Sequence, residues 1–148
     1  MFHEVVEGGA SGGDGDAANA DDLLAAFETM MRDAADAAGR EALTEEAGVS
    51  ASTARAVAGG DVSSVTVTAG AAVLAAADAD RDADAVVTAV RDHLLMGMTT
   101  AVLDVDTIAA RIDADLTGQE LQQALEGRTA MTLEQLAEVM AVIERRKR

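Results

Sequence analysis

The polar side chains best suited to recognising another molecule fall in two short stretches of this 148-residue chain. The stretch from 117 to 128 carries Gln119, Gln122, Gln123 and Arg128, and the stretch from 50 to 60 carries Ser52 and Arg55. Glutamine amides can pair with the edge of adenine, while arginine and serine bind phosphate oxygens. These residue types therefore offer the chemistry of nucleic-acid binding. Glutamines and a basic helix end are also ordinary features of a solvated helix, and the sequence leaves both interpretations open.

The sequence contains no arrangement of residues that is typical of an enzyme. It has no cysteine, no nucleophile paired with a base and no glycine-rich phosphate loop. His93 lies beside an apolar stripe, which favours a packed or surface residue over a catalyst. The alternating aspartates at 78–84 resemble a calcium loop but lack its central glycine and distal glutamate, so we interpret them as a solvated hinge. We expect neither catalysis nor a bound metal or cofactor.

Helices are the elements that would position the candidate residues. The chain has no proline, and apolar residues recur at helical spacing between residues of the type that cap helices. We expect N-caps at Asp21, Ser50, Thr66, Thr117 and Thr132, the last two completed by Glu120 and Gln135. The predicted helices are 21–39, 40–47, 50–60, 66–77, a long helix with an apolar stripe from Val87 to Val105, 106–113, 117–127 and 132–148. Gly97 inside the long helix indicates either a kink or a close helix crossing.

The two halves of the chain share one pattern. When Gly60 is aligned with Gly127, Ser50 falls on Thr117 and Ala54 on Leu121, and after a one-residue deletion Val67 falls on Leu133. Agreement of caps, closing glycines and apolar positions over four helices indicates an internal duplication. We therefore expect an all-α fold in which two tandem four-helix units pack into one compact body. The first unit would span residues 21–80 and the second 81–148, after a flexible N-terminal segment at 1–20.

The segment AGVSAST at 47–53 resembles the turn and recognition-helix start of phage-repressor-like helix-turn-helix domains. Gly48 would form the tight turn, Val49 would enter the core and Ser50 would cap the helix that Gly60 ends. The resemblance implies that Ser52 and Arg55 face the major groove of DNA. In the second unit the turn around 113–116 departs from the motif, and one interpretation is that it contains two extra residues. Its glutamines and Arg128 nevertheless offer more side chains that could contact DNA, and the basic residues at 145–148 would add positive charge.

The charge of the chain is strongly negative, with 27 acidic against 11 basic residues and a net charge of −16. Residues 1–80 hold 15 acids and 3 bases, whereas residues 81–148 hold 12 acids and 8 bases. Together with the start MFHEV and the run DHLLMGMTTAVLDVDTIA, this composition resembles a haloarchaeal family of small acidic proteins of unknown function. At about 1 M salt the Debye length is only about 3 Å, which screens such self-repulsion. We expect a cytoplasmic protein that is adapted to high salt and has no membrane span.

Two functions follow as hypotheses. The first is a DNA-binding or transcription-associated protein whose tandem helix-turn-helix-like units contact double-stranded DNA. The second is a protein-interaction or self-association module that has lost DNA binding and pairs with a second copy or another protein. The acidity weighs less against DNA binding in molar salt, because counterion release contributes little to affinity there.

Overall fold

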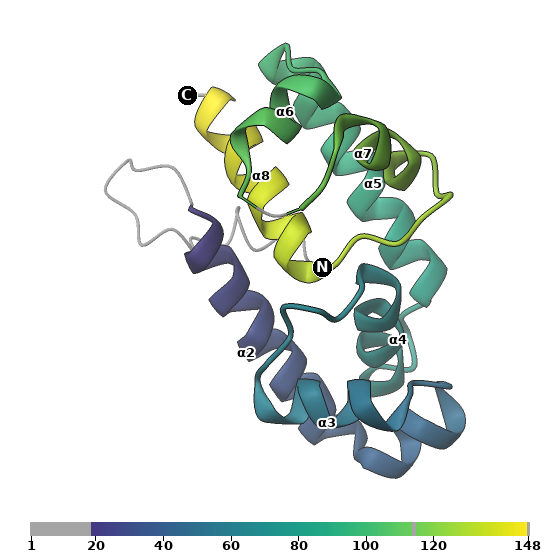
Figure 1. Ribbon diagram of the computed structural model, residues 1–148. Helices are drawn as coiled ribbons and strands as arrows, with labels where there is room; N and C mark the ends of the chain where they lie inside the picture. The colour runs from purple at the N-terminus through teal and green to yellow at the C-terminus, as the bar shows by residue number, and fades with distance from the viewer. Residues whose placement is uncertain (1–18, 114, 148) are drawn as a thin grey trace.

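The computed structural model describes residues 19–113 and 115–147, and within them the chain is all-helical (Figure 1). The helices, in chain order, are α2 (Ala20–Ala38), the π-helical segment η1 (Ala42–Glu46), α3 (Ala51–Gly59), α4 (Val67–Ala77), α5 (Ala83–Ala101), α6 (Val105–Arg111), α7 (Gly118–Leu125) and α8 (Leu133–Lys147). The all-α prediction is confirmed. The predicted flexible segment at 1–20 lies outside the described residues, apart from Asn19 and Ala20.

Four of the five predicted side-chain caps are found where the sequence predicts them. The hydroxyls of Ser50 and Thr66 accept hydrogen bonds from the amides three residues on, at 3.1 and 3.0 Å. Thr117 and Thr132 form the predicted capping boxes with Glu120 and Gln135. Each cap satisfies an amide that the first helical turn leaves without an intrahelical partner.

Two local predictions were wrong. The N-cap of α2 is Asn19, whose side chain accepts the amide of Asp22 at 2.8 Å, so Asp21 lies in the first turn instead. The predicted helix 40–47 contains a π-helical turn, because the amide of Ala47 reaches back five residues to the carbonyl of Ala42 at 3.0 Å. This wider turn still buries Leu43 in the core.

The long helix α5 is also shorter at its C-terminus than predicted. It ends at Ala101, and Val102 caps it in the left-handed conformation with a φ of 56°. Val105 therefore opens α6 and is only half-buried. On the core side of α5, Val86 is buried where Val87 was expected, and Val87 is half-buried. Met30 of α2 and Ala77 of α4, both expected in the core, are likewise half-buried.

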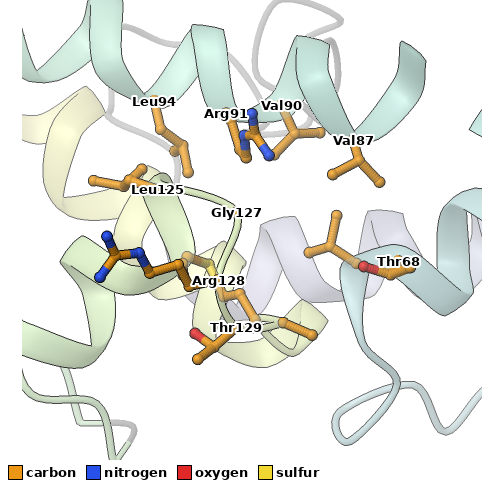
Figure 2. Close-up of a pocket in the computed structure, with 13 residues that line it drawn as sticks. Thr68, Val87, Val90, Arg91, Leu94, Leu125, Gly127, Arg128 and Thr129 are labelled. Atoms are coloured by element: carbon orange, nitrogen blue, oxygen red, sulfur yellow. The ribbon is translucent and has the colours of Figure 1, made fainter. Parts of the chain in front are cut away.

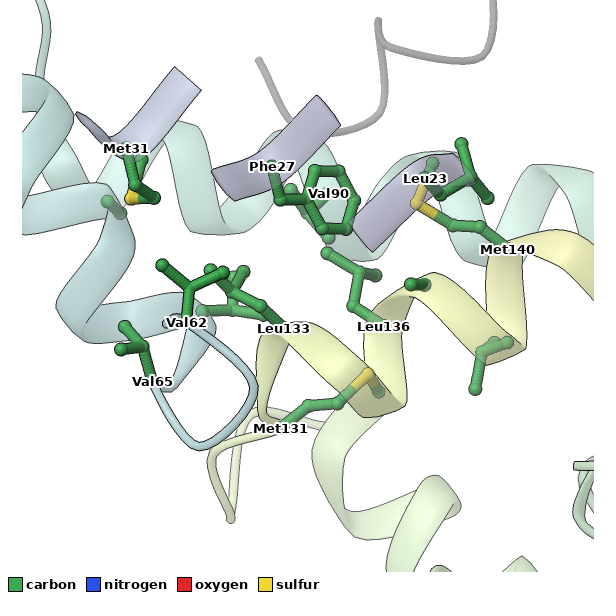
Figure 3. Packing of buried hydrophobic residues seen from close by; sticks show 14 of the residues in the cluster. Leu23, Phe27, Met31, Val62, Val65, Val90, Met131, Leu133, Leu136 and Met140 are labelled. Carbon is green, nitrogen blue, oxygen red and sulfur yellow. The ribbon is translucent and has the colours of Figure 1, made fainter. Parts of the chain in front are cut away.

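One apolar core joins the two halves of the chain. Helix α2 packs on α4 of its own half and on α8 of the other, while α5 packs on α8 and on α4. Figure 3 shows Leu23 and Phe27 of α2 facing side chains of α8, with Met31 nearer Val62. The α8 residues on this face include Leu133, Leu136 and Met140, each at most 1% exposed. The described residues therefore bury their apolar side chains in one continuous cluster.

Gly97 marks a close helix crossing, which is one of the two predicted alternatives. A Cβ at this position would lie 2.8 Å from Cγ2 of Ile143, so only glycine lets α5 and α8 approach this closely. The helix continues through Gly97 to Ala101. The small residue thus contributes to the packing between two core helices.

The N-termini of α4 and α8 are joined by a single antiparallel β-bridge between Thr66 and Thr132. The amide of Val67 donates to the carbonyl of Met131 at 2.7 Å, and the amide of Leu133 donates to the carbonyl of Val65 at 2.8 Å. The bridge is isolated, and no strand is formed around it among the described residues. It also places the two helix N-caps opposite each other.

Candidate nucleic-acid interface

Helix α7 is held at both ends by local interactions. At its start, Thr117 Oγ1 accepts the amide of Glu120 at 3.1 Å, while Glu120 Oε1 accepts the amide of Thr117 at 2.9 Å. Gly118 lies against the Asp106 carboxylate, which occupies the space a side chain would need. At its end, Gly127 takes a φ of +81°, a conformation that glycine adopts without strain. The helix is therefore short and fixed in position on α6 and α5.

The buried face of α7 consists of Leu121, Ala124 and Leu125. Gln119 and Gln122 point away from this face and are exposed, whereas Gln123 is half-buried. Because residues three and four apart share a side of a helix, Gln119 is a neighbour of the other two glutamines. The structure thus brings the predicted glutamines together on one accessible surface.

Glu126, which was not among the predicted site residues, contacts two of them. One of its carboxylate oxygens accepts Gln122 Nε2 at 3.2 Å, and the other lies 3.5 Å from Arg128 Nε. Both partners of the ion pair are largely solvated, with 71% of the Arg128 side chain and 42% of the Glu126 side chain exposed. Such an exposed pair contributes little to stability. The Gln122–Glu126 spacing of four residues on a helix is the signal that could have revealed it.

Helix α3 confirms the local geometry expected at 47–60. Gly48 has a φ of +71°, Val49 is 6% exposed, Ser50 caps the helix and Gly60 ends it with a φ of +81°. Ser52 and Arg55 are both exposed. They line a shallow surface hollow together with Asp61, so an acidic side chain accompanies the arginine here.

The connection before α7 is longer than the connection before α3. This agrees with the interpretation of the sequence in which two extra residues are present. Four residues separate η1 from α3, and six separate α6 from α7. The longer connection is tied to α8, because Asp113 N donates to Glu138 Oε1 at 2.9 Å and Gln135 Nε2 donates to the Asp115 carbonyl at 3.2 Å. The extra length therefore forms contacts with the core helix.

The two candidate surfaces do not meet. Figure 1 shows α3 at the lower end of the molecule and α7 near the upper end. Helix α3 packs on α2 and η1, while α7 packs on α6 and α5. Ser52 and Arg55 therefore belong to a different surface from Gln119, Gln122, Gln123 and Arg128.

The basic C-terminus is partly engaged within the fold. Arg146 Nε donates to the carbonyl of Ala101 at 3.3 Å, where a cation suits the negative end of the α5 dipole. Arg145 is exposed and lines a surface hollow with Arg111 and Glu138. Arg148 lies outside the described residues.

The acidic connection between α4 and α5 has a local structural role. Asp78 accepts the amide of Asp80 at 3.0 Å and Arg81 Nε at 3.1 Å, and Asp82 caps α5. The backbone hydrogen bond from Asp80, followed by the bond from Arg81, lowers the pKa of Asp78. Among the described residues, no group of three or more acidic or histidine side chains is arranged to hold a metal ion.

Within the described residues the fold is all-helical with one continuous core, and the short helices α3 and α7 lie on separate surfaces. A family model described as "Family of unknown function (DUF5791)" matches residues 23–146, and the chain belongs to this family. No curated protein and no solved structure matches it significantly. No single helix among the described residues is long and apolar enough to cross a membrane. Helices α5 and α6 reach this length and apolar character only together, and the chain bends by 94° between them.

Proposed function

We propose that this protein binds double-stranded DNA through the exposed face of α7 and has no catalytic role. The observation that carries the proposal is the position of Gln119 and Gln122 on the solvated side of a helix whose opposite side is anchored in the core. A short, fixed helix with amide side chains on its outer face matches the geometry by which recognition helices read base edges in the major groove. Arg128, just after the closing glycine, would then contact a phosphate.

The proposal includes two repressor-like units related by duplication. The helix order α2–η1–α3–α4 corresponds to α5–α6–α7–α8, and the caps Thr66 and Thr132 face each other across the bridge. The closing glycines, Gly60 and Gly127, both have a φ of +81°. An arginine from the first helix of each unit, Arg32 or Arg91, covers the closing glycine of that unit. These equivalences support the two-unit arrangement.

The charge distribution favours the second half of the chain as the DNA-binding half. Residues 81–148 hold 12 acids and 8 bases, against 15 acids and 3 bases in residues 1–80. We propose that the protein acts in a cytoplasm of high salt, where electrostatic repulsion from DNA is screened within a few ångströms. Affinity would then depend on hydrogen bonds and shape, which the glutamines can supply.

A selection from random double-stranded DNA in about 2 M KCl, followed by fluorescence anisotropy, tests the proposal. The triple variant Q119A/Q122A/R128A should lose binding at least about tenfold, since each base contact contributes about 1–3 kcal/mol. The variant S52A/R55A, altered on the remote surface of α3, is the matched control and should bind as the natural protein does. Failure to enrich any DNA, or equal binding by the α7 variant, would refute the proposal.

A second candidate function is protein interaction, in particular self-association, and exposed apolar side chains favour it. Leu95, Met96 and Val102 are 45%, 70% and 82% exposed at the C-terminal end of α5. Leu95 and Met96 line one surface hollow with Thr99 and Thr100, and exposed large apolar side chains often mark an interaction site. Sedimentation velocity of the natural protein and of the variant M96E/V102E tests this candidate. A dimer that dissociates in the variant would support self-association, whereas a monomer in both would exclude it.

A further inference from the structure

A hollow of about 210 Å³ lies between α4, α5 and the segment that follows α7. Figure 2 shows side chains of α5 on one side, facing Leu125, Gly127, Arg128 and Thr129 on the other. Its walls combine polar and apolar surface in similar amounts, and the apolar part comes from residues such as Val67, Val87, Val90, Leu94, Leu125 and Met131. Two arginines line it, Arg91 and Arg128, and no acidic residue does, although the chain has 27 acidic residues.

Arg91 lacks a partner in this hollow. Its Nε is buried without a hydrogen bond, and within residues 19–113 and 115–147 no ion pair involves it. The guanidinium packs against Gly127, in the space that a side chain there would fill. A buried donor without an acceptor is unfavourable, and more so when it is charged. The Arg91 side chain lines the hollow, so an anionic ligand there would give the guanidinium a partner that the fold does not provide.

The rim of the hollow provides further polar groups. Arg128 is mostly exposed, and its contact with Glu126 is a weak surface pair at 3.5 Å. Thr129 is exposed beside it and carries a hydroxyl that can donate or accept. A negatively charged group bound at Arg91 could therefore be contacted from the rim as well.

We propose that this hollow binds a small monocarboxylate with an apolar body of about six to ten non-hydrogen atoms. A cavity of about 150 Å³ holds a benzene-sized molecule, so the available space fits a ligand of this size. A planar guanidinium matches the geometry of a carboxylate, which can accept two parallel hydrogen bonds. The aliphatic part of the wall disfavours a second charge on the ligand, because burying an unpaired charge is costly. This inference does not depend on DNA binding.

Isothermal titration calorimetry of the full chain in about 2 M KCl tests the proposal with hexanoate as the probe. Two matched compounds separate the contributions of the two ends: 1-hexanol has the apolar body without the charge, and acetate has the charge without the body. Hexanoate should bind with a stoichiometry of one and at least about tenfold more tightly than either, since one charge-assisted hydrogen bond contributes about 1.5–3 kcal/mol. Equal affinity for 1-hexanol, or no saturable binding of hexanoate, would overturn the proposal.

Two arginine variants assign the site. R91M keeps the apolar stem and removes the guanidinium, and it should weaken hexanoate binding at least about tenfold. R32M is the matched control, because Arg32 covers Gly60 in the first half of the chain but does not line the hollow. R91K, which retains the charge without the planar donor pair, should give an intermediate loss and serves if R91M does not fold. Unchanged affinity in both Arg91 variants would overturn the assignment.

Discussion

Thr66 and Thr132 lie opposite each other in an antiparallel bridge, each at the N-cap of a core helix. The two halves of the chain exchange hydrogen bonds there, from Val67 N to Met131 O at 2.7 Å and from Leu133 N to Val65 O at 2.8 Å. A reciprocal pair of this kind fixes the starting points of α4 and α8 relative to one another. The bridge thus connects the two halves through hydrogen bonds between main-chain atoms.

Removing both caps at this bridge should have a combined effect that is not additive. T66A and T132A each remove a capping bond and should lower the free energy of unfolding by about 1 kcal/mol. Because both residues belong to one bridge, the double variant should deviate from the sum by about 0.5 kcal/mol or more. Urea denaturation measures the three values. T66A combined with T117A, at the cap of α7, should be additive, and additivity in both pairs would contradict the prediction.

Alanine at Gly97 should destabilise the protein. The new Cβ would meet Ile143 Cγ2 at 2.8 Å, and overpacking of a core contact costs about 1–3 kcal/mol. At Gly59, nothing lies within 4 Å of the corresponding position, so G59A should be neutral or stabilise by up to about 1 kcal/mol. Thermal denaturation compares the two variants. A G97A protein as stable as G59A would show that α5 and α8 do not cross closely at this point.

Replacing Glu126 should increase DNA binding if α7 is the reading helix. E126Q removes the negative charge that pairs with Arg128 at 3.5 Å, so Arg128 becomes available to a phosphate, while the new amide oxygen can still accept the hydrogen bond from Gln122. Anisotropy with the selected DNA should show a severalfold lower Kd. The stability should change by less than about 1 kcal/mol, because the ion pair is solvated. The substitution E134Q, on the exposed surface of α8, provides the comparison for a simple change of net charge.

The cap of α6 should make stability depend on pH. The backbone hydrogen bond from Thr107, at 2.8 Å, lowers the pKa of Asp104 below its usual value of about 3.9. A lowered pKa in the folded state means that this contribution is complete above the unfolded value and is lost as the pH falls through the folded one. D104N keeps a capping side chain without the titration. The stability of the natural protein relative to D104N, measured in urea, should therefore fall between pH 5 and pH 2, and a constant difference would contradict the prediction.

Dilute buffer should weaken the fold. With a net charge of −16, the acidic side chains repel one another over a Debye length that grows from about 3 Å at 1 M salt to about 30 Å at 0.01 M. The helical circular-dichroism signal should decrease when KCl is lowered from about 2 M to about 0.01 M. Sucrose is excluded from protein surfaces but does not screen charge. Recovery of the signal with KCl and not with sucrose would therefore identify charge screening as the cause. An unchanged signal would count against adaptation to high salt.

The candidate interface could be predicted in part from local sequence patterns. The exposure of Gln119 and Gln122 could be predicted, because the apolar residues of α7 fall at helical spacing and leave the opposite side to solvent. Glu126 was not predicted, because a carboxylate repels phosphate and its role follows only from its contacts with Gln122 and Arg128. The separation of α3 from α7 could not be predicted, since it depends on how α2, α4, α5 and α8 pack.

The sequence by itself determined the helices, their caps and the glycines that end them. A cap joins residues three positions apart and a closing glycine needs only its own φ, so these features are set by short-range interactions. Tertiary structure alone decided the crossing at Gly97, the facing of Thr66 and Thr132, and the hollow around Arg91. Each of these brings together residues that are distant in the chain, and their contacts depend on the packing of several helices at once.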